Sequence, residues 1–78
     1  MKWKRQLHTI QQPNNQKIFK HYGIGKNANW SVTKDHRGAI TFRDFPNSYR
    51  AELIGFFDTV KRAKRVCEYI DANLKEKN

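Results

Sequence analysis

The most regular pattern of apolar and polar positions lies near the C-terminal end of the sequence. Apolar residues recur there at spacings of three and four, at Val60, Ala63, Cys67, Ile70 and Leu74. This spacing places them on one face of an α-helix, and Asp58 or Thr59 is a residue type that caps a helix start. The pattern predicts an amphipathic helix that begins near Val60. On its exposed side, Asp71 and Lys75 are spaced for an ion pair.

A second pattern, alternation of apolar and polar residues, occupies the middle of the chain. It covers residues 29–34 and 39–45, and the Asp-His-Arg-Gly segment at 35–38 between them is typical of a turn. Alternation on both sides of a turn predicts a β-hairpin. Because side chains alternate across a strand, one face is expected to be core and the other polar. We expect the core face to hold Trp30, Val32, Ile40 and Phe42, and the polar face to hold Ser31, Thr33, Thr41 and Arg43.

Two more strands are expected beside the hairpin. Residues 17–25 mix aromatic and β-branched side chains and end in glycine, which is typical of a strand that enters a turn. After the turn signal at 46–48, the segment 49–57 contains an apolar run interrupted by Gly55 and is predicted to be the last strand. The predicted fold is α+β: a three- or four-stranded antiparallel sheet packed against one C-terminal α-helix, in a single domain at 17–78.

The first sixteen residues lack a sustained period and are rich in Gln and Asn. We therefore predict a loosely held basic arm at 1–16, because polar termini are often poorly ordered. The alternative is a short helix or an edge strand that docks Trp3 on the core.

The net charge of the chain predicts what kind of partner the protein binds. The 78 residues contain 16 Lys and Arg against 7 Asp and Glu, a formal net charge of +9. A domain of this size buries too little surface for a deep catalytic pocket, whereas its charge favours an anionic partner through counterion release. We expect nucleic acid first, an acidic protein surface second and a membrane surface third.

Other mechanisms are not supported by the sequence. Cys67 is the single cysteine and the three histidines are scattered, so we expect no disulfide, metal or cofactor. No apolar run approaches the ~18 residues of a membrane span, and the first residues do not resemble a signal peptide. We therefore expect a cytoplasmic or nucleoid-associated protein in a reducing compartment.

Three features resemble catalytic or phosphate-binding sites, but each has a simpler structural explanation. Cys67 occupies a core position of the predicted helix, where a cysteine usually acts as a small apolar residue. Asp35 and Asp44 are explained by a turn and a strand end. Residues 23–26 are too short for a P-loop. The protein is expected not to be an enzyme.

The basic residues in and beside the predicted strands form the strongest candidate site. Together with hydroxyl side chains they are suited to phosphates and base edges. The candidate nucleic-acid-binding residues are Lys20, Lys26, Thr33, Arg37, Thr41, Arg43 and Arg50. A separate group of cations opens the predicted helix: Lys61, Arg62, Lys64 and Arg65. These cations oppose the helix dipole, so a binding role is an alternative to a solvated face.

The segments 29–35, 54–59 and 61 onward resemble the plant APETALA/ethylene-response-type DNA-binding domain. That domain is similar to the amino-terminal arm-binding domains of tyrosine recombinases and to modules of phage homing nucleases. The resemblance implies that the sheet face opposite the helix enters the major groove. It implies that Thr33, Thr41 and Arg43 lie on that face, with Lys26, Arg37 and Arg50 at its rim. This chain departs from the family by having room for two strands between Gly38 and Phe57, and by lacking an arginine-dense first strand.

The sequence therefore predicts a non-enzymatic module that binds nucleic acid, with double-stranded DNA as the expected partner. A phage or mobile-element accessory factor suits such a chain. One alternative is a binder of RNA or single strands that stacks bases on Tyr22, Trp30 or Tyr49. Another is an interaction module that docks on an acidic protein.

Overall fold

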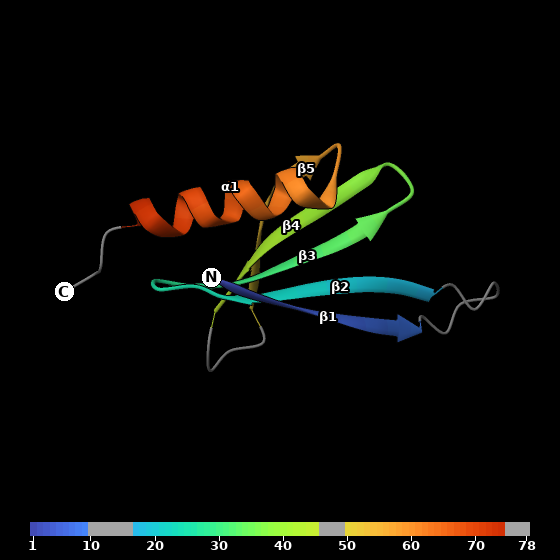
Figure 1. The fold of residues 1–78 in the computed structure, drawn as a ribbon, viewed down its shortest axis with the longest axis horizontal. Coiled ribbons are helices and arrows are strands. Elements are labelled where there is room, and N and C mark those ends of the chain that lie inside the picture. Colours follow the sequence, from blue (N-terminus) through green and yellow to red (C-terminus); the bar gives the residue numbers. More distant parts are fainter. Residues whose placement is uncertain (10–16, 46–49, 75–78) are drawn as a thin grey trace.

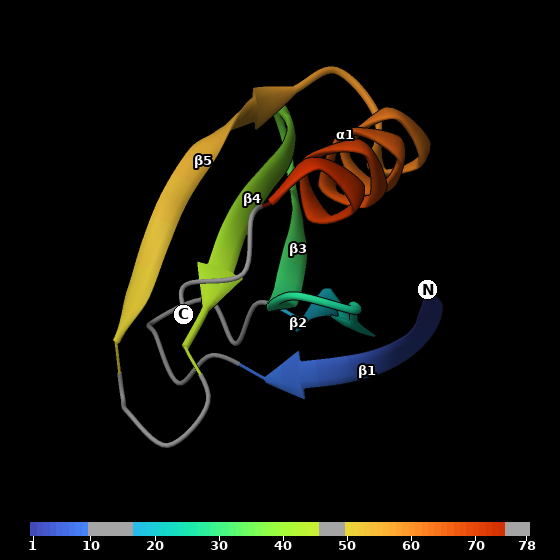
Figure 2. The same ribbon diagram turned by 90° about the vertical axis from the view of Figure 1, so that its left-hand side faces the viewer.

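A computed structural model describes residues 1–9, 17–45 and 50–74. Within these residues the chain forms five strands followed by one helix (Figure 1). They are β1 (Lys2–Thr9), β2 (Lys17–Ile24), β3 (Asn29–Asp35), β4 (Gly38–Asp44), β5 (Ala51–Phe57) and α1 (Val60–Asn73). Each strand pairs antiparallel with the next, so the sheet order is the chain order. Figure 2 shows α1 on one side of the twisted sheet, where it contacts β3, β4 and β5.

The antiparallel sheet and its C-terminal helix confirm the predicted class, but the described sheet has five strands rather than three or four. The additional strand is β1, which falls in the segment predicted to be a loose arm. It pairs with β2 from Lys2 to Thr9, and Trp3 packs against the core. For residues 2–9 the alternative of an edge strand is therefore correct; the rest of the arm, 10–16, lies outside the described residues.

The β3–β4 hairpin forms as expected, but its register differs from the prediction. The turn has two residues, His36 and Arg37, and pairs Asp35 with Gly38. With this turn, each even-numbered residue of β3 pairs with an odd-numbered residue of β4, for example Val32 with Thr41. The prediction instead placed the even-numbered residues of both strands on one face. Since directly paired residues share a face, Thr41 and Arg43 lie on the helix side with Trp30 and Val32. Ile40 and Phe42 lie on the opposite side with Ser31 and Thr33.

The core lies between the helix and the central strands. Its buried apolar residues are Trp30, Val32, Ala39, Ala63 and Cys67. The predicted apolar face of the helix is confirmed, and Thr59 caps α1 by accepting a hydrogen bond from the backbone N–H of Arg62 at 3.1 Å. Opposite Thr41 and Phe42, strand β5 bulges at Ile54, which packs against the core.

Asp71 fastens the last turn of α1 to the β2–β3 loop. Its carboxylate accepts hydrogen bonds from the backbone N–H groups of Lys26 (2.7 Å), Asn27 (3.0 Å) and Ala28 (2.9 Å). Asn27 also donates its side-chain amide to the Asp71 carbonyl at 2.6 Å. The carboxylate is thus buried in the fold instead of lying on the exposed side; Lys75, its expected partner, is outside the described residues.

Trp3 makes a second long-range connection, between the first strand and the helix. Its indole N–H donates to Glu68 Oε1 at 2.9 Å, and the Lys64 ammonium lies 5.6 Å from the ring centre. The ring crosses Gly23, where an added Cβ would come within 2.8 Å of it. A side chain at position 23 would therefore displace Trp3.

Candidate nucleic-acid interface

The sheet face opposite α1 carries two parallel rows of side chains that change in character from β1 to β5. The strand registers place Lys4, Tyr22, Ser31, Phe42 and Leu53 in one row and Gln6, Lys20, Thr33, Ile40 and Phe56 in the next. Both rows are polar on β1–β3 and apolar on β4 and β5. We call the first part the basic half-face: Lys2, Lys4, Gln6, His8, Lys20, Tyr22, Ser31 and Thr33. The second part is the apolar half-face: Ile40, Phe42, Leu53 and Phe56.

The basic half-face offers both charge and hydrogen bonds. Lys2 and Lys4 are exposed at the β1 edge. The Tyr22 hydroxyl shares a hydrogen bond with His8 Nε2 at 3.1 Å. Burial, and next the negative charge of Asp44, raise the pKa of Tyr22, so this hydroxyl stays neutral and keeps its proton at physiological pH. Cations beside neutral hydroxyl groups are suited to phosphate oxygens and sugars.

Of the residues predicted to bind nucleic acid, the structure brings two together on this face. Lys20 and Thr33 are direct cross-strand partners, so their side chains leave the same face of the sheet from neighbouring positions. Neither residue is fully buried.

Two other candidates, Thr41 and Arg43, lie on the wrong side of the sheet. Thr41 is fully buried, and its hydroxyl has no partner among the described residues. Arg43 forms an ion pair with Glu52 on β5, and its guanidinium lies 5.1 Å from the centre of the Phe45 ring. The two-residue turn that sets the hairpin register removes both from the expected polar face.

The remaining candidates stand at opposite ends of the sheet. Lys26 is exposed in the β2–β3 loop, whereas Arg37 is exposed in the β3–β4 turn. Arg50 precedes β5 and lies 5.8 Å from the Phe45 ring centre. These three residues border the sheet and do not form one cluster.

A second group of cations lies on the helix side of the sheet, around His21. Burial lowers the pKa of His21, and the charges of Lys64 and then Arg5 lower it further. Within the described chain, His21 Nδ1 is buried without a hydrogen-bond partner. In the predicted cationic group of the helix, Lys64 lies over Trp3, and Arg62 lies 3.7 Å from Asp58. Two of its four cations thus have partners inside the molecule.

The Cys67 thiol has no features of a nucleophile. It is fully buried, and this burial, with the adjacent Glu68 charge, raises its pKa to about 12. A thiol with that pKa is almost entirely protonated at neutral pH. Among the described residues there is no group of three or more His, Cys, Asp or Glu side chains placed to hold a metal ion. No helix in that part of the chain is long and apolar enough to cross a membrane.

The aromatic residues named as possible stacking platforms are not the exposed ring of this face. Trp30 is 1% exposed beneath the helix, Tyr22 is half-buried, and Tyr49 lies outside the described residues. Phe56, by contrast, is 69% exposed on the apolar half-face. The sequence contains a signal for this: Phe56 and Phe57 are adjacent in a strand, so their side chains point to opposite faces and only one of them can pack beneath the helix.

Comparisons of the chain with protein-family models, with curated proteins and with solved structures found no match.

Proposed function

We propose that this protein is a non-enzymatic nucleic-acid-binding module that holds double-stranded DNA against the basic half-face. The observation that carries the proposal is the cross-strand pair of Lys20 and Thr33, set beside the exposed Lys2 and Lys4 on the face opposite the helix. The resemblance to the APETALA-type domain supports the same face, because that family uses the sheet surface opposite its helix.

The charge of the whole chain supports the proposal in a different way. A net charge of +9 attracts any polyanion, but charge alone gives neither orientation nor contact geometry. The basic half-face supplies orientation and contact geometry, since its cations and hydroxyl groups share one surface of a sheet. Duplex phosphates can be contacted there without a change in the fold.

The test is a salt titration of duplex affinity by fluorescence anisotropy. The basic half-face has three lysines, and Lys26, Arg37 and Arg50 border the sheet. If these cations together neutralise ~4–6 phosphates, we expect log affinity to fall with log salt at a slope of roughly −3.5 to −5.5. Lys20→Ala should weaken binding and reduce the size of that slope by about 0.9. The matched control is Arg62→Ala, which removes the same charge from the helix side and should leave the slope unchanged.

Two results would contradict the proposal. If Arg62→Ala reduces the slope and Lys20→Ala does not, the duplex binds the helix side. If duplex DNA does not bind at all while an acidic protein or RNA does, the module belongs to one of the alternative classes.

A further inference from the structure

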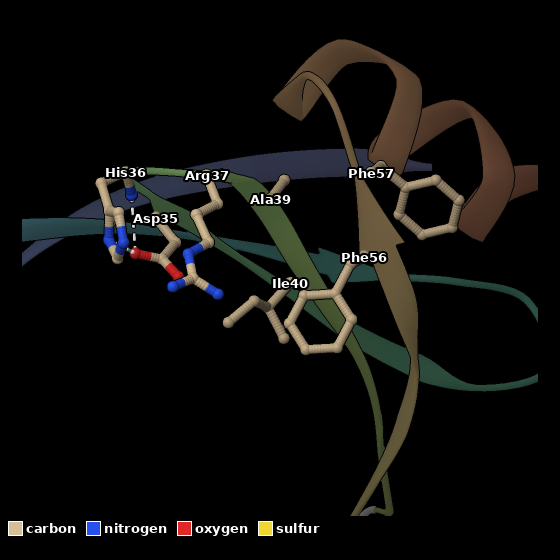
Figure 3. A pocket seen from close by; sticks show the side chains of 7 residues that line it. All are labelled: Asp35, His36, Arg37, Ala39, Ile40, Phe56 and Phe57. Atoms are coloured by element: carbon tan, nitrogen blue, oxygen red, sulfur yellow. Dashed lines mark hydrogen bonds and ion pairs between the residues drawn. The ribbon is translucent and has the colours of Figure 1, made fainter.

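A pocket of about 410 Å³ opens where the β3–β4 turn meets the end of β5. Figure 3 shows the seven residues that line it: Asp35, His36, Arg37, Ala39, Ile40, Phe56 and Phe57. The pocket adjoins the row that runs from Gln6 through Lys20 and Thr33 to Phe56, so one end of the basic half-face leads toward it.

One wall of the pocket is flat and apolar. Ile40 and Phe56 are cross-strand partners, and Figure 3 shows the Phe56 ring beside Ile40. Phe56 is 69% exposed, although the transfer of a phenylalanine side chain out of water is favourable by ~1.5–3 kcal/mol. An exposed ring with one open side provides a surface on which another planar ring can stack.

The other wall is polar and cationic. Arg37 lines it with an exposed side chain. His36 contacts the Asp35 carboxylate twice: its ring Nδ1 lies 2.5 Å from Asp35 Oδ1, and its backbone N–H donates a hydrogen bond to the same oxygen at 2.6 Å. Lys17 and Lys34 line a second hollow, of about 380 Å³, on the far side of this turn. The apolar ring itself is thus bordered by one cation, Arg37, and by the Asp35 carboxylate that His36 contacts.

An exposed Phe56 ring beside the Arg37 guanidinium complements a planar ring that carries a negative group, which is the chemistry of a nucleotide. A second copy of the chain fits less well, because each copy brings a net charge of +9. A base paired within a duplex is stacked on both sides and offers no free ring face, whereas an unpaired base does.

We propose that the Phe56 pocket binds an unpaired base next to a duplex, so that the preferred ligand is duplex DNA with a single-stranded overhang. This inference rests on the proposed function: the duplex occupies the basic half-face, and the first unpaired nucleotides extend along the sheet to Phe56, with their phosphates near Arg37.

The experiment compares one labelled duplex in two forms, blunt and with a three-nucleotide dT overhang, by fluorescence anisotropy. Stacking of one base predicts that the wild-type protein binds the overhang form at least about fivefold more tightly. Phe56→Leu should lose this preference and bind the blunt duplex unchanged. Phe56→Trp should keep it, and Leu53→Ala, which alters the apolar half-face outside the pocket, should keep it as well.

The possible outcomes separate this inference from the proposed function. Equal wild-type affinity for the two forms overturns the inference and leaves the proposed function standing. Absence of binding to both forms overturns the proposed function. A wild-type dimer in sedimentation velocity that Phe56→Leu converts to a monomer also overturns the inference, because the ring would then belong to a self-association surface. Retained preference in a folded Phe56→Leu protein, checked by circular dichroism, overturns it too.

Discussion

The indole N–H of Trp30, in the middle of the core, donates a hydrogen bond to the Asp71 carboxylate at 3.3 Å. The same carboxylate accepts three backbone N–H groups of the β2–β3 loop. One side chain on the helix therefore satisfies donors from the loop and from the largest core residue. Because unsatisfied buried donors are costly, this carboxylate connects helix, loop and sheet in one network.

We expect Asp71→Ala to be among the most destabilising substitutions in the chain. The change leaves the Trp30 indole and the loop N–H groups without their acceptor, and each buried unsatisfied group costs about 1–3 kcal/mol. We expect the free energy of unfolding to fall by at least about 3 kcal/mol, measured by urea denaturation monitored by tryptophan fluorescence. Asp58→Ala is the matched control: its carboxylate is exposed and 3.7 Å from Arg62, so the loss should stay below about 0.5 kcal/mol. Equal losses would show that the network does not stabilise the fold.

The same carboxylate gives stability a defined dependence on pH. Burial tends to raise the pKa of Asp71, but hydrogen bonds from Asn27, Lys26, Trp30 and Ala28 outweigh it and lower the pKa below its ordinary value of 3.8. The unfolded chain therefore takes up this proton at a higher pH than the folded chain. The contribution is complete above pH 3.8 and is lost as the pH falls through the folded-state pKa. Melting temperatures between pH 2 and 6 should show a decline in the wild type that is smaller in Asp71→Asn.

The close packing of the β2–β3 loop can be tested at Gly25, with Gly55 in β5 as the control position. A Cβ at Gly25 would lie 2.4 Å from Asp71 Oδ1 and 2.6 Å from the Ala28 carbonyl oxygen, whereas at Gly55 the nearest atom is 3.6 Å away in the Phe57 ring. We expect Gly25→Ala to lower the free energy of unfolding by at least about 2 kcal/mol, because it overpacks the site and displaces the network. Gly55→Ala should change it by less than about 1 kcal/mol. A tolerated Gly25→Ala, measured by the same denaturation, would contradict the close approach.

The pKa of His21 depends on the cations of the helix side. Its pKa lies below 6.5 because burial disfavours the imidazolium, and the charges of Lys64 and Arg5 add to this effect. Lys64→Ala removes one positive charge and should raise the pKa of His21, measured by NMR titration of the ring protons. Arg62→Ala should leave the pKa in place, because Arg62 is not among the groups that shift it. An unchanged His21 titration in Lys64→Ala would show that Lys64 does not contribute and that burial and Arg5 account for the lowered pKa.

The periodic parts of the fold were predictable from the sequence. The helix face from Val60 to Leu74 and the hairpin around residues 35–38 follow from local spacing alone. The turn was predicted at the right residues, but the faces of the two hairpin strands were not. A turn over 35–38 already pairs Lys34 with Ala39, as in the structure. Even-numbered residues of β3 therefore share a face with odd-numbered residues of β4, which places Thr41 and Arg43 on the helix side.

Long-range contacts account for the other differences. The N-terminal segment forms a strand by pairing with β2 along Lys2–Thr9, and Trp3 reaches Glu68 on the helix. No pattern within residues 2–9 reveals either partner. Asp71 was predicted to lie on the exposed side because its spacing from Lys75 suits an ion pair. Its role depends instead on three N–H groups more than forty residues away. Strand alternation placed Thr33 on the polar face, whereas Lys20 was named only as a cation in a predicted strand. Their pairing depends on the register between β2 and β3.

The order of the strands has a consequence for how the chain folds. Every ladder joins neighbours in the sequence, so the sheet can grow hairpin by hairpin with short loops to close. The contacts from Trp3 to Glu68 and from the β2–β3 loop to Asp71 instead join residues that are 65 and 45 positions apart. We therefore expect the helix to dock late, as the step that converts a loosely paired meander into a cooperative unit.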